Sequence, residues 1–244
     1  RYVQNAKAEV AAQTLTVGES VAAGSVIGTV LATDTDPGTT FSQWQIKSDP
    51  SARFVSDAAT GVVSLAAGAT LDFETLTSHT ISVSVYDGYM RSDAGTVTIK
   101  VVNVNDNAPS ITAGQAFNID DGSRYTLGEL DAIDADDTNE PGFTTFSNWT
   151  VVGGTGASVF TIERATGKLQ IKRPLLIDFS RSNYTVLATV SDGLNVSDPQ
   201  TVTIAIPRKV TMCLLGILQL DIPRQAAHLL LRNGAALGSC KRLW

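Results

Sequence analysis

The sequence predicts an all-β protein: two tandem seven-stranded Greek-key β-sandwiches, followed by a C-terminal tail that is not homologous to them. Three observations predict this fold class. A unit of about one hundred residues occurs twice, apolar and polar residues alternate along its predicted strands, and Gly, Pro, Asp and Asn separate these runs. No convincing amphipathic helix precedes residue 208.

The internal repeat is visible in three long motifs that recur in the same order. DTDPGTTFSQWQI begins at Asp34 and returns as DADDTNEPGFTTFSNWTV at Asp134, and FVSDAATGVVSL begins at Phe54 and returns as FTIERATGKLQI at Phe160. LDFETLTSHTISVSVYDG returns as IDFSRSNYTVLATVSDG at nearly the same spacing. Because chance would not preserve both the order and an offset of 100 to 106 residues, the body of the chain is two copies of one domain.

Each copy contains runs that alternate with a period of two residues, as half-buried strands do. The alternation is clear over residues 80–85 and 96–101 of the first copy, and over 184–190 and 201–206 of the second. About seven such short strands in one hundred residues are typical of a Greek-key sandwich.

Three ring side chains receive an interpretation at this stage. Trp44 and Trp149 occupy matching positions, each just before an apolar strand, and we interpret both as core residues. The alternative is a platform on which a sugar ring stacks. His79 is a lone histidine between strands, and we expect it at the surface.

Composition and charge exclude several classes of function. The chain has 18 Lys and Arg against 24 Asp and Glu, a formal net charge of −6, so a nucleic-acid partner is not expected. Both cysteines, Cys213 and Cys240, lie in the tail, so neither disulfides nor Cys-ligated zinc hold the body together. The longest apolar run, residues 210–220, is too short to span a membrane. No Ser-His-Asp order and no phosphate-binding glycine loop are present, and we expect no enzyme.

The chain divides into five expected segments. These are residues 1–7, the remnant of an upstream linker; 8–102, the first repeat; 103–109, a second linker; 110–207, the second, partly degenerate repeat; and 208–244, the tail. The first residue is Arg1 and no signal-like run follows it, so we take the chain as a piece of a longer protein. The basic, Leu-rich tail is interpreted either as an anchor or partner-binding helix over residues 225–237, or as an alternative splice or frameshift product, which we favour.

Acidic residues surround the linker between the copies. Residues 102–109 read VNVNDNAP, and the residue before proline is pushed towards extended backbone. Alone, this segment fits an ordinary linker. Acids in the turns of both copies indicate a further role for this segment. These are Glu19, Asp72 and Glu74 in the first copy and Asp134, Asp136 and Asp192 in the second.

The combination of VGES, DTDPG, LDFE, YDG and VNVNDNAP is similar to the extracellular cadherin repeat, and the similarity covers residues from about 8 to 207. The marks of that family are an acid near the first strand, the turns A-x-D-x-D, L-D-x-E and A-x-D-x, and a D-x-N-D-N-x-P linker. The first copy shows each of these features, with Asn103 in place of the first acid of the linker.

The resemblance implies that about three calcium ions bind at the junction of the two copies. By the same resemblance, the ions nearer the first copy would be held by Glu19, Asp72, Glu74 and Asp106. Asp136 would bridge ions, while Asp134 and Asp192 would hold the ion nearer the second copy. Asn105 would coordinate through its side chain, and Val104, Asn107 and the loop near Thr144 through backbone carbonyls.

The chemistry of this set agrees with calcium. All the donors are hard oxygen atoms, with no His or Cys among them, which suits calcium rather than a transition metal. Converging carboxylates repel one another without cations, so the junction should loosen in the absence of calcium and become stiff in its presence. Modules of this kind bind calcium with dissociation constants of about 10⁻⁴–10⁻³ M.

Departures from the family pattern restrict the number of such sites. Upstream, Gln4 and Lys7 stand where the linker acid and proline would be, so Asp34, Asp36 and Asp87 are expected to bind metal only if a further repeat precedes. Downstream, Ser180 replaces the turn glutamate, and no linker follows Pro207. The early acid of the second copy has only Asp120 or Asp121 as candidates. We therefore expect one well-formed junction, between the copies.

The second copy also carries three glycosylation sequons, at Asn148, Asn183 and Asn195. In a secreted eukaryotic protein these are candidate surface sites. We expect Asn148 to be poorly exposed, because it lies beside Trp149.

Two functions follow from these expectations. The first is a calcium-dependent adhesion segment of an extracellular, cell-surface protein that is itself membrane-anchored. It would act in homophilic adhesion or as a rigid spacer, and its partner would be another cadherin-like surface or another cell-surface protein. Some family members exchange an N-terminal tryptophan, but no Trp precedes Trp44 here. The alternative is a set of calcium-dependent carbohydrate-binding repeats of a bacterial surface or secreted protein, with polysaccharide as the partner.

Overall fold

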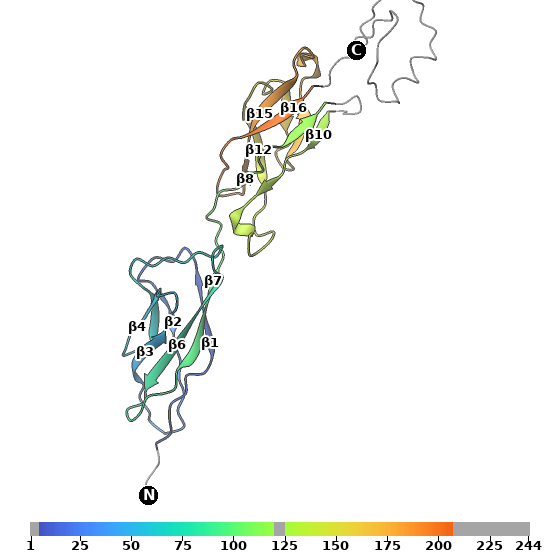
Figure 1. The fold of residues 1–244 in the computed structure, drawn as a ribbon. Coiled ribbons are helices and arrows are strands. Elements are labelled where there is room, and N and C mark those ends of the chain that lie inside the picture. Colours follow the sequence, from blue (N-terminus) through green and yellow to red (C-terminus); the bar gives the residue numbers. More distant parts are fainter. Residues whose placement is uncertain (1–4, 120–124, 207–244) are drawn as a thin grey trace, which may run out of the picture.

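The described part of the chain forms two β-sandwiches placed end to end (Figure 1). The computed structural model describes residues 5–119 and 125–206, and nearly all of their regular structure is β-strand, which confirms the predicted fold class. The predicted tail, with Cys213 and Cys240, and the candidates Asp120 and Asp121 lie outside the described residues.

In the first repeat a four-stranded sheet packs on a three-stranded sheet. The larger sheet has the order β1-β7-β6-β3, built from β1 (Gln13–Gly18), β7 (Gly95–Val102), β6 (Ser78–Tyr86) and β3 (Ser42–Ser48). The smaller has the order β2-β5-β4, built from β2 (Val26–Thr29), β5 (Val62–Leu65) and β4 (Phe54–Ser56). β1 runs parallel to β7 and the other pairs are antiparallel.

The second repeat has the same two-sheet arrangement. Its larger sheet has the order β12-β15-β16-β9, built from β12 (Ser147–Gly153), β15 (Asn183–Ser191), β16 (Gln200–Ala205) and β9 (Ala116–Asn118). The smaller has the order β10-β14-β13, built from β10 (Thr126–Glu129), β14 (Lys168–Ile171) and β13 (Phe160–Ile162). A short pair, β8 (Ser110–Ile111) with β11 (Ala132–Ile133), and two 3-10 turns, η1 (Ala135–Asp137) and η2 (Pro174–Leu176), complete it.

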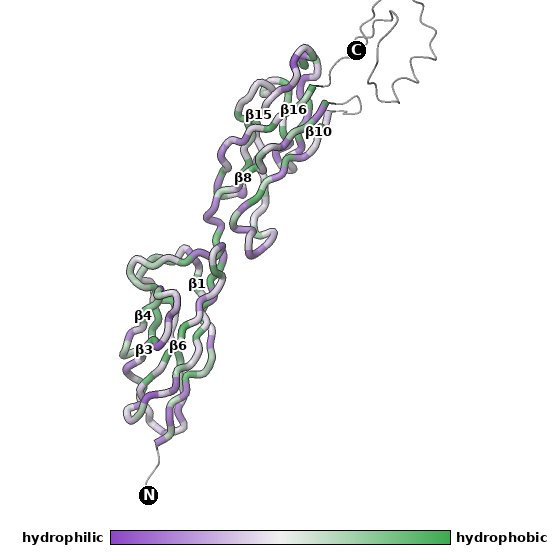
Figure 2. Tube along the Cα trace, in the orientation of Figure 1, coloured by the Kyte–Doolittle hydropathy of each residue, from purple (hydrophilic) through white to green (hydrophobic). Residues whose placement is uncertain are grey.

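Each repeat has a hydrophobic core of its own. The period-two alternation turns Val97, Ile99 and Val101 of β7 inward, where all three are fully buried, and Val202 and Ile204 of β16 are buried in the same way. Hydrophobic and hydrophilic residues alternate along the strands of both bodies in Figure 2. The two core clusters share no residue, so apolar packing does not set how one repeat sits on the other.

The two matching tryptophans are buried, which confirms that they are core residues and leaves neither face available for a sugar. Each ring packs over a glycine with a left-handed backbone: Trp44 over Gly61 (φ 73°) and Trp149 over Gly167 (φ 77°). A Cβ atom at Gly61 would lie 2.8 Å from the Trp44 ring, which is closer than carbon atoms pack. The recurrence of this contact shows that the repeat is preserved at the level of packing.

The expectation that His79 lies at the surface is wrong. This side chain is 6% exposed, and its ring stands edge-on to Phe54 with a centroid separation of 5.3 Å. The alternation of β6 places His79 on the same inward face as Ile81. Burial lowers the pKa of His79, and the nearby charge of Arg53 lowers it further.

Replacing Gly61 by Ala should destabilise the first repeat more than replacing Gly68 by Ala. Both glycines have positive φ (73° and 76°), but a Cβ at Gly68 would meet nothing within 4 Å, so this variant reports backbone strain alone. We expect Gly61→Ala to cost about 1–3 kcal/mol more, because overpacking against the Trp44 ring is added to the strain. Denaturant unfolding monitored by tryptophan fluorescence measures both costs; equal costs would show that the ring moves aside freely.

The burial of His79 should make the first repeat less stable in mild acid. Because its pKa is lower in the folded state, the unfolded chain binds more protons as pH falls through about 6.5, and the free energy of unfolding decreases. Denaturant unfolding of wild type and His79→Gln at about pH 7.5 and about pH 5.5 should show a larger loss in the wild type, since glutamine does not titrate. The same pH dependence in both proteins would contradict this account.

Candidate metal site at the junction of the repeats

The connection between the repeats is the segment 103–109, which has no regular secondary structure and joins β7 to β8 (Figure 1). It is tied to the first repeat through Glu19, which follows β1. Glu19 Oε1 accepts a hydrogen bond from the Val104 N–H at 2.7 Å, and Oε2 accepts one from the Phe73 N–H at 2.6 Å. This buried carboxylate therefore holds the linker against the turn that precedes β6.

One group of carboxylates gathers on the first-repeat side of the junction. Glu19, Glu74 and Asp106 each offer an oxygen, and these oxygens lie within 4.8 Å of one another. They come from three separate segments: the end of β1, the turn before β6, and the linker. Glu74 Oε1 is buried and has no hydrogen-bond partner in the described part of the chain.

A second group lies on the other side of the linker. Asp134, Asp136 and Asp192 are all buried, and their oxygens also lie within 4.8 Å of one another. Asp134 precedes η1 and accepts from the Asp136 N–H at 3.0 Å, which turns the chain so that both side chains lie in the same site. Asp192 follows β15, and Asp134 Oδ2 is buried without a described partner. Asp136 is 0% exposed.

The two groups form one region of uncompensated negative charge. Burial raises the pKa of Glu74 and of Asp106, and the charges of Glu19 and Asp136 raise both further. Burial likewise raises the pKa of Asp134, with added contributions from Asp136 and Asp192. The charge of Asp136 acts on residues of both groups. A cation bound beside Asp136 would therefore favour the ionised form of the carboxylates in both groups.

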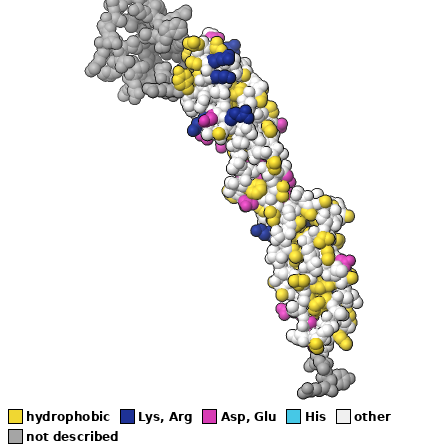
Figure 3. Space-filling model, turned by 180° about the vertical axis from the view of Figure 1, so that it is seen from behind, with side chains coloured by type: hydrophobic (Ala, Val, Ile, Leu, Met, Phe, Trp, Pro, Cys, Tyr) yellow, Lys and Arg dark blue, Asp and Glu magenta, His cyan; other side chains and the backbone are white. Residues whose placement is uncertain are grey.

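Basic side chains do not neutralise this charge. The ion pairs found among the described residues are Lys7 with Asp93 and Arg181 with Asp178, both away from the junction. On the face shown in Figure 3, most Lys and Arg side chains gather towards the outer half of the second repeat. Four of the six acids, Glu19, Asp134, Asp136 and Asp192, are buried, Glu74 is half-buried and Asp106 is exposed. Buried acids without basic partners are what a cation site requires.

The remaining predicted ligands lie near these groups with different partners. Asp72 is exposed, and its carboxylate accepts hydrogen bonds from the Thr75 N–H and hydroxyl, so it caps its own turn. It belongs to neither carboxylate group, but its charge raises the pKa of Asp106. Asn105 Oδ1 and the Asn107 carbonyl accept from the side chain of Asn195 at 3.0 and 2.9 Å.

Asn107 and Thr144 complete the predicted set. The Asn107 amide donates to Asp136 Oδ1 at 2.6 Å and to Asp106 Oδ1 at 2.9 Å, so it reaches both carboxylate groups. Thr144 is buried and held by Asp137, which accepts from its N–H and its hydroxyl at 2.9 Å each.

Sequence reasoning missed three asparagine side chains at this junction. The family pattern shows Asn103 only as the replacement of the first linker acid, yet its Nδ2 donates to the Asp136 carbonyl at 2.8 Å. Asn139 was not singled out, and its Nδ2 donates to the carbonyls of Phe73 and Glu74 at 3.0 Å each. Asn195 was considered only as a sequon. The one signal available was the insertion around Asn139, which lengthens this turn relative to the first copy.

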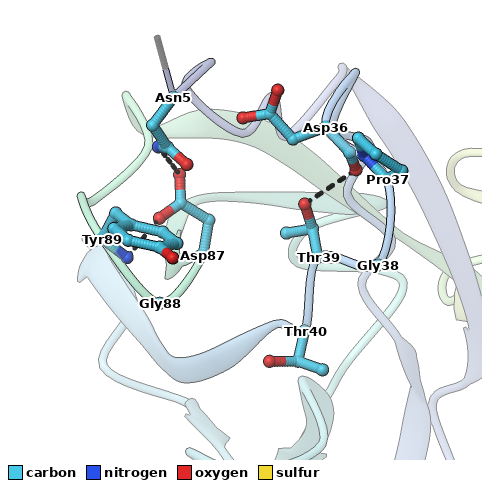
Figure 4. Close-up of a pocket in the computed structure, with 9 residues that line it drawn as sticks. All are labelled: Asn5, Asp36, Pro37, Gly38, Thr39, Thr40, Asp87, Gly88 and Tyr89. Atoms are coloured by element: carbon cyan, nitrogen blue, oxygen red, sulfur yellow. Dashed lines mark hydrogen bonds between the residues drawn. The ribbon is translucent and has the colours of Figure 1, made fainter. Parts of the chain in front are cut away.

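The corresponding acids at the N-terminal end of the first repeat are arranged differently. Asp36 and Asp87 line an open pocket with Asn5, Thr39 and Tyr89 (Figure 4). Within the described ranges, Asp34, Asp36 and Asp87 do not form a close group like that of their counterparts in the second repeat.

Local partners occupy Asp36 and Asp87, whereas Asp34 Oδ2 is buried without a described partner, as Asp134 Oδ2 is at the junction. Asp36 Oδ2 accepts from the Ala6 N–H at 2.6 Å, and Asp87 Oδ2 accepts from the Asn5 amide at 3.3 Å. Hydrogen bonding from the backbone of Met90 and Tyr89 lowers the pKa of Asp87. The upstream metal site therefore stays a prediction that depends on a preceding repeat.

At the distal end of the second repeat, the degenerate turn satisfies its own acid. Asp178 accepts from the Ser180 N–H and hydroxyl and pairs with Arg181 at 3.5 Å, and the bonds from Ser180 lower its pKa. In the described part of this end, no group of acids converges as it does at the junction.

The sequons differ in accessibility. Asn183 is exposed, and Asn148 is exposed as well, which contradicts the expectation for Asn148: its positive φ of 54° turns it away from the core while Trp149 points inward. Asn195 is half-buried and its amide nitrogen is engaged by the linker. Whether any of them is glycosylated stays a prediction.

Comparison with known proteins identifies relatives of this chain. No protein-family model matches it. Human cadherin-23 is 29% identical over 195 residues, which is 76% of this chain, and human protocadherin-16 is 32% identical over 193 residues, which is 73% of it. The chain spans only about 6% of the length of each of these two proteins. Mouse cadherin-related family member 1 is 40% identical over 102 residues, 38% of this chain and 12% of that protein.

Solved structures show the same fold. The EC22-24 segment of mouse cadherin-23 matches with a TM-score of 0.60 at 22% identity, covering 84% of this chain and 65% of that one. The EC1-3 segment of mouse protocadherin-24 matches with a TM-score of 0.65 at 17% identity, covering 83% of this chain and 70% of that one. Within the described residues, no helix is long and apolar enough to cross a membrane. The chain belongs to the cadherin family, and it corresponds to extracellular repeats of these cell-surface adhesion proteins.

Proposed function

We propose that this chain is a segment of a calcium-dependent adhesion protein, in which calcium ions bound between the two repeats fix their relative orientation. The observation that carries the proposal is the pair of carboxylate groups at the junction, each within 4.8 Å, with no basic partner among the described residues. Since the cores do not touch, the junction is the place where the orientation of the repeats is decided.

The residues present fit calcium. Every side-chain donor in the two groups is a carboxylate oxygen, a hard ligand that suits calcium rather than a transition metal. Glu74 Oε1 and Asp134 Oδ2 are buried without partners, and buried polar atoms normally have one, so each of these two atoms lacks a donor or a cation. About three divalent ions would balance most of the charge of the seven predicted carboxylates.

The chain's own residues supply the mechanical coupling. Glu19 holds the linker and the turn before β6 together, and Asp136 lies where its charge reaches both groups. When calcium satisfies the carboxylates, their mutual repulsion becomes attraction to a shared ion, and rotation about the linker is restricted. The two sandwiches then behave as one stiff rod.

The role in the whole protein follows from this rigidity. We propose that the segment is an internal spacer that sets the length and stiffness of the extracellular part of a membrane-anchored protein. In this proposal, residues 8–102 and 110–207 are the two repeats and residues 103–109 are the calcium-binding linker. Contact with another cadherin-like surface would then depend on the extended form. The carbohydrate alternative loses its support, because both tryptophans that could have stacked on a sugar are buried. No catalytic role is proposed for the acids, since ion binding accounts for them.

Calcium titration of the whole chain tests the proposal directly. Calorimetry should show saturable binding of about three ions with dissociation constants of about 10⁻⁴–10⁻³ M. Small-angle scattering should show a longer, less variable particle in calcium than in EDTA, because the carboxylates repel one another without the ion. Absence of binding at about 10 mM calcium, well above these constants, would refute the proposed function.

Asp136→Asn should weaken binding more than a matched change outside the junction. Asp136 is fully buried and acts on both groups, so its loss should weaken calcium binding by about 10-fold or more. The control is Asp131→Asn, which removes the same charge from an exposed site in the same repeat, where the carboxylate contacts Thr112. Equal calorimetric titrations for the two variants would show that the junction is not the binding site.

A further inference from the structure

We propose that three asparagine side chains, Asn103, Asn139 and Asn195, hold the junction in its closed arrangement by hydrogen bonds that require no metal ion. We call this set the amide brace. Asn103 and Asn195 tie the linker to the second repeat, and Asn139 ties the second repeat to the first. Its consequence for calcium affinity rests on the proposed function, whereas the brace itself is a property of the metal-free chain.

Asn139 makes the direct connection between the repeats. From the loop after η1, its Nδ2 donates to the carbonyl oxygens of Phe73 and Glu74, both at 3.0 Å, in the turn before β6 of the first repeat. One amide group thus uses both of its hydrogen atoms on two successive carbonyls. Because Glu74 is a candidate ligand, Asn139 fixes the backbone from which that carboxylate projects.

Asn103 connects the start of the linker to the second repeat. Its side chain is 6% exposed, and Nδ2 donates to the Asp136 carbonyl at 2.8 Å. An aspartate, the residue that the family pattern has at this position, carries no donor and could not make this bond. The departure from the pattern therefore exchanges a negative charge for a hydrogen-bond donor directed at the residue that links the two carboxylate groups.

Asn195 closes the network from the loop after β15. Its Nδ2 donates to Asn105 Oδ1 at 3.0 Å and to the Asn107 carbonyl at 2.9 Å, and it also lies 3.3 Å from Asp192 Oδ2, a weaker third acceptor. Both acceptors are proposed calcium ligands, and a carbonyl oxygen has two lone pairs, so accepting this bond leaves one free for a cation. Asn195 therefore orients these two oxygens and also contacts the carboxylate of Asp192 in the second group.

The brace and the carboxylates act in opposite directions when no ion is present. The carboxylates repel one another. The hydrogen bonds donated by the asparagine side chains involve a neutral donor and persist in EDTA. They raise the fraction of molecules whose junction is already closed, and the apparent dissociation constant for calcium falls in proportion to that fraction. The three asparagines are thus positioning residues for calcium binding.

Alanine variants of the two more accessible asparagines test the brace. Asn139→Ala and Asn195→Ala should each give a broader distribution of interdomain distances by small-angle scattering in EDTA, and should weaken calcium binding by about 3- to 10-fold. Asn183→Ala is the matched control, because Asn183 is an exposed asparagine at the start of β15, in the same repeat. The whole chain is produced in bacteria, so that no sequon is glycosylated.

A charged variant separates the loss of the brace from a change in electrostatics. Asn139→Asp removes the donor but adds a negative charge near the junction, and charge alone would tighten calcium binding. We expect it to weaken binding, as Asn139→Ala does. The thermal midpoint of each repeat should stay unchanged in the Asn139 variants, because Asn139 is exposed and contacts only turns.

Three results would overturn the proposal. The first is that the small-angle scattering curves of the variants in EDTA superimpose on those of wild type and Asn183→Ala. The second is that the variants bind calcium more weakly while their scattering in EDTA is unchanged. The third is a lowered thermal midpoint, which would assign these side chains to folding. If the wild type itself binds no calcium, the proposed function fails, and the EDTA comparison still decides whether the brace exists.

Discussion

The shape of this chain depends on like charges that are gathered between two hydrophobic cores that do not touch. Each repeat is stabilised by its own buried residues, and the clusters have no member in common. Folding therefore proceeds without fixing the angle between the repeats. That angle is left to a short linker, to the hydrogen bonds of Asn103 and Asn139, and to two groups of carboxylates whose repulsion is not relieved by any described basic side chain. A small change in the charge of the junction can thus alter the geometry of the whole rod without altering either fold.

The same acidic motif has a different outcome at each end of a repeat. At the junction, a complete linker brings Asp134, Asp136 and Asp192 together. At the upstream end, the Asn5 amide and the Ala6 N–H occupy two of the three equivalent carboxylates, Asp87 and Asp36, and the three acids form no close group among the described residues. At the distal end, the turn acid is satisfied by Ser180 and Arg181. A local turn motif therefore contributes to a close group of carboxylates only where a second segment converges on it.

The sequence could predict the fold because the signals for it are local and repeated. Alternation in β6, β7, β15 and β16 and the matching tryptophans depend on neighbouring residues and on a second copy of the same pattern. His79 was misplaced because composition treats histidine as a surface residue, whereas its position in the alternation of β6 turns it inward. The asparagines of the junction could not be found in this way. The partners of Asn139 lie 65 and 66 residues away in the sequence, and no local pattern records contacts of that range.

The exchange of an acid for Asn103 is physically consistent with this arrangement. An aspartate there would add a carboxylate to a region where burial and neighbouring charges already raise the pKa of Glu74, Asp106 and Asp134. The amide instead donates to the Asp136 carbonyl and adds no charge. Each such exchange lowers the repulsion between carboxylates in the closed junction. It also adds a hydrogen bond that persists when no ion is bound. If calcium binds as proposed, the ratio of amides to carboxylates at a junction determines how far its stiffness depends on the ion, and the exchange at Asn103 lowers that dependence here.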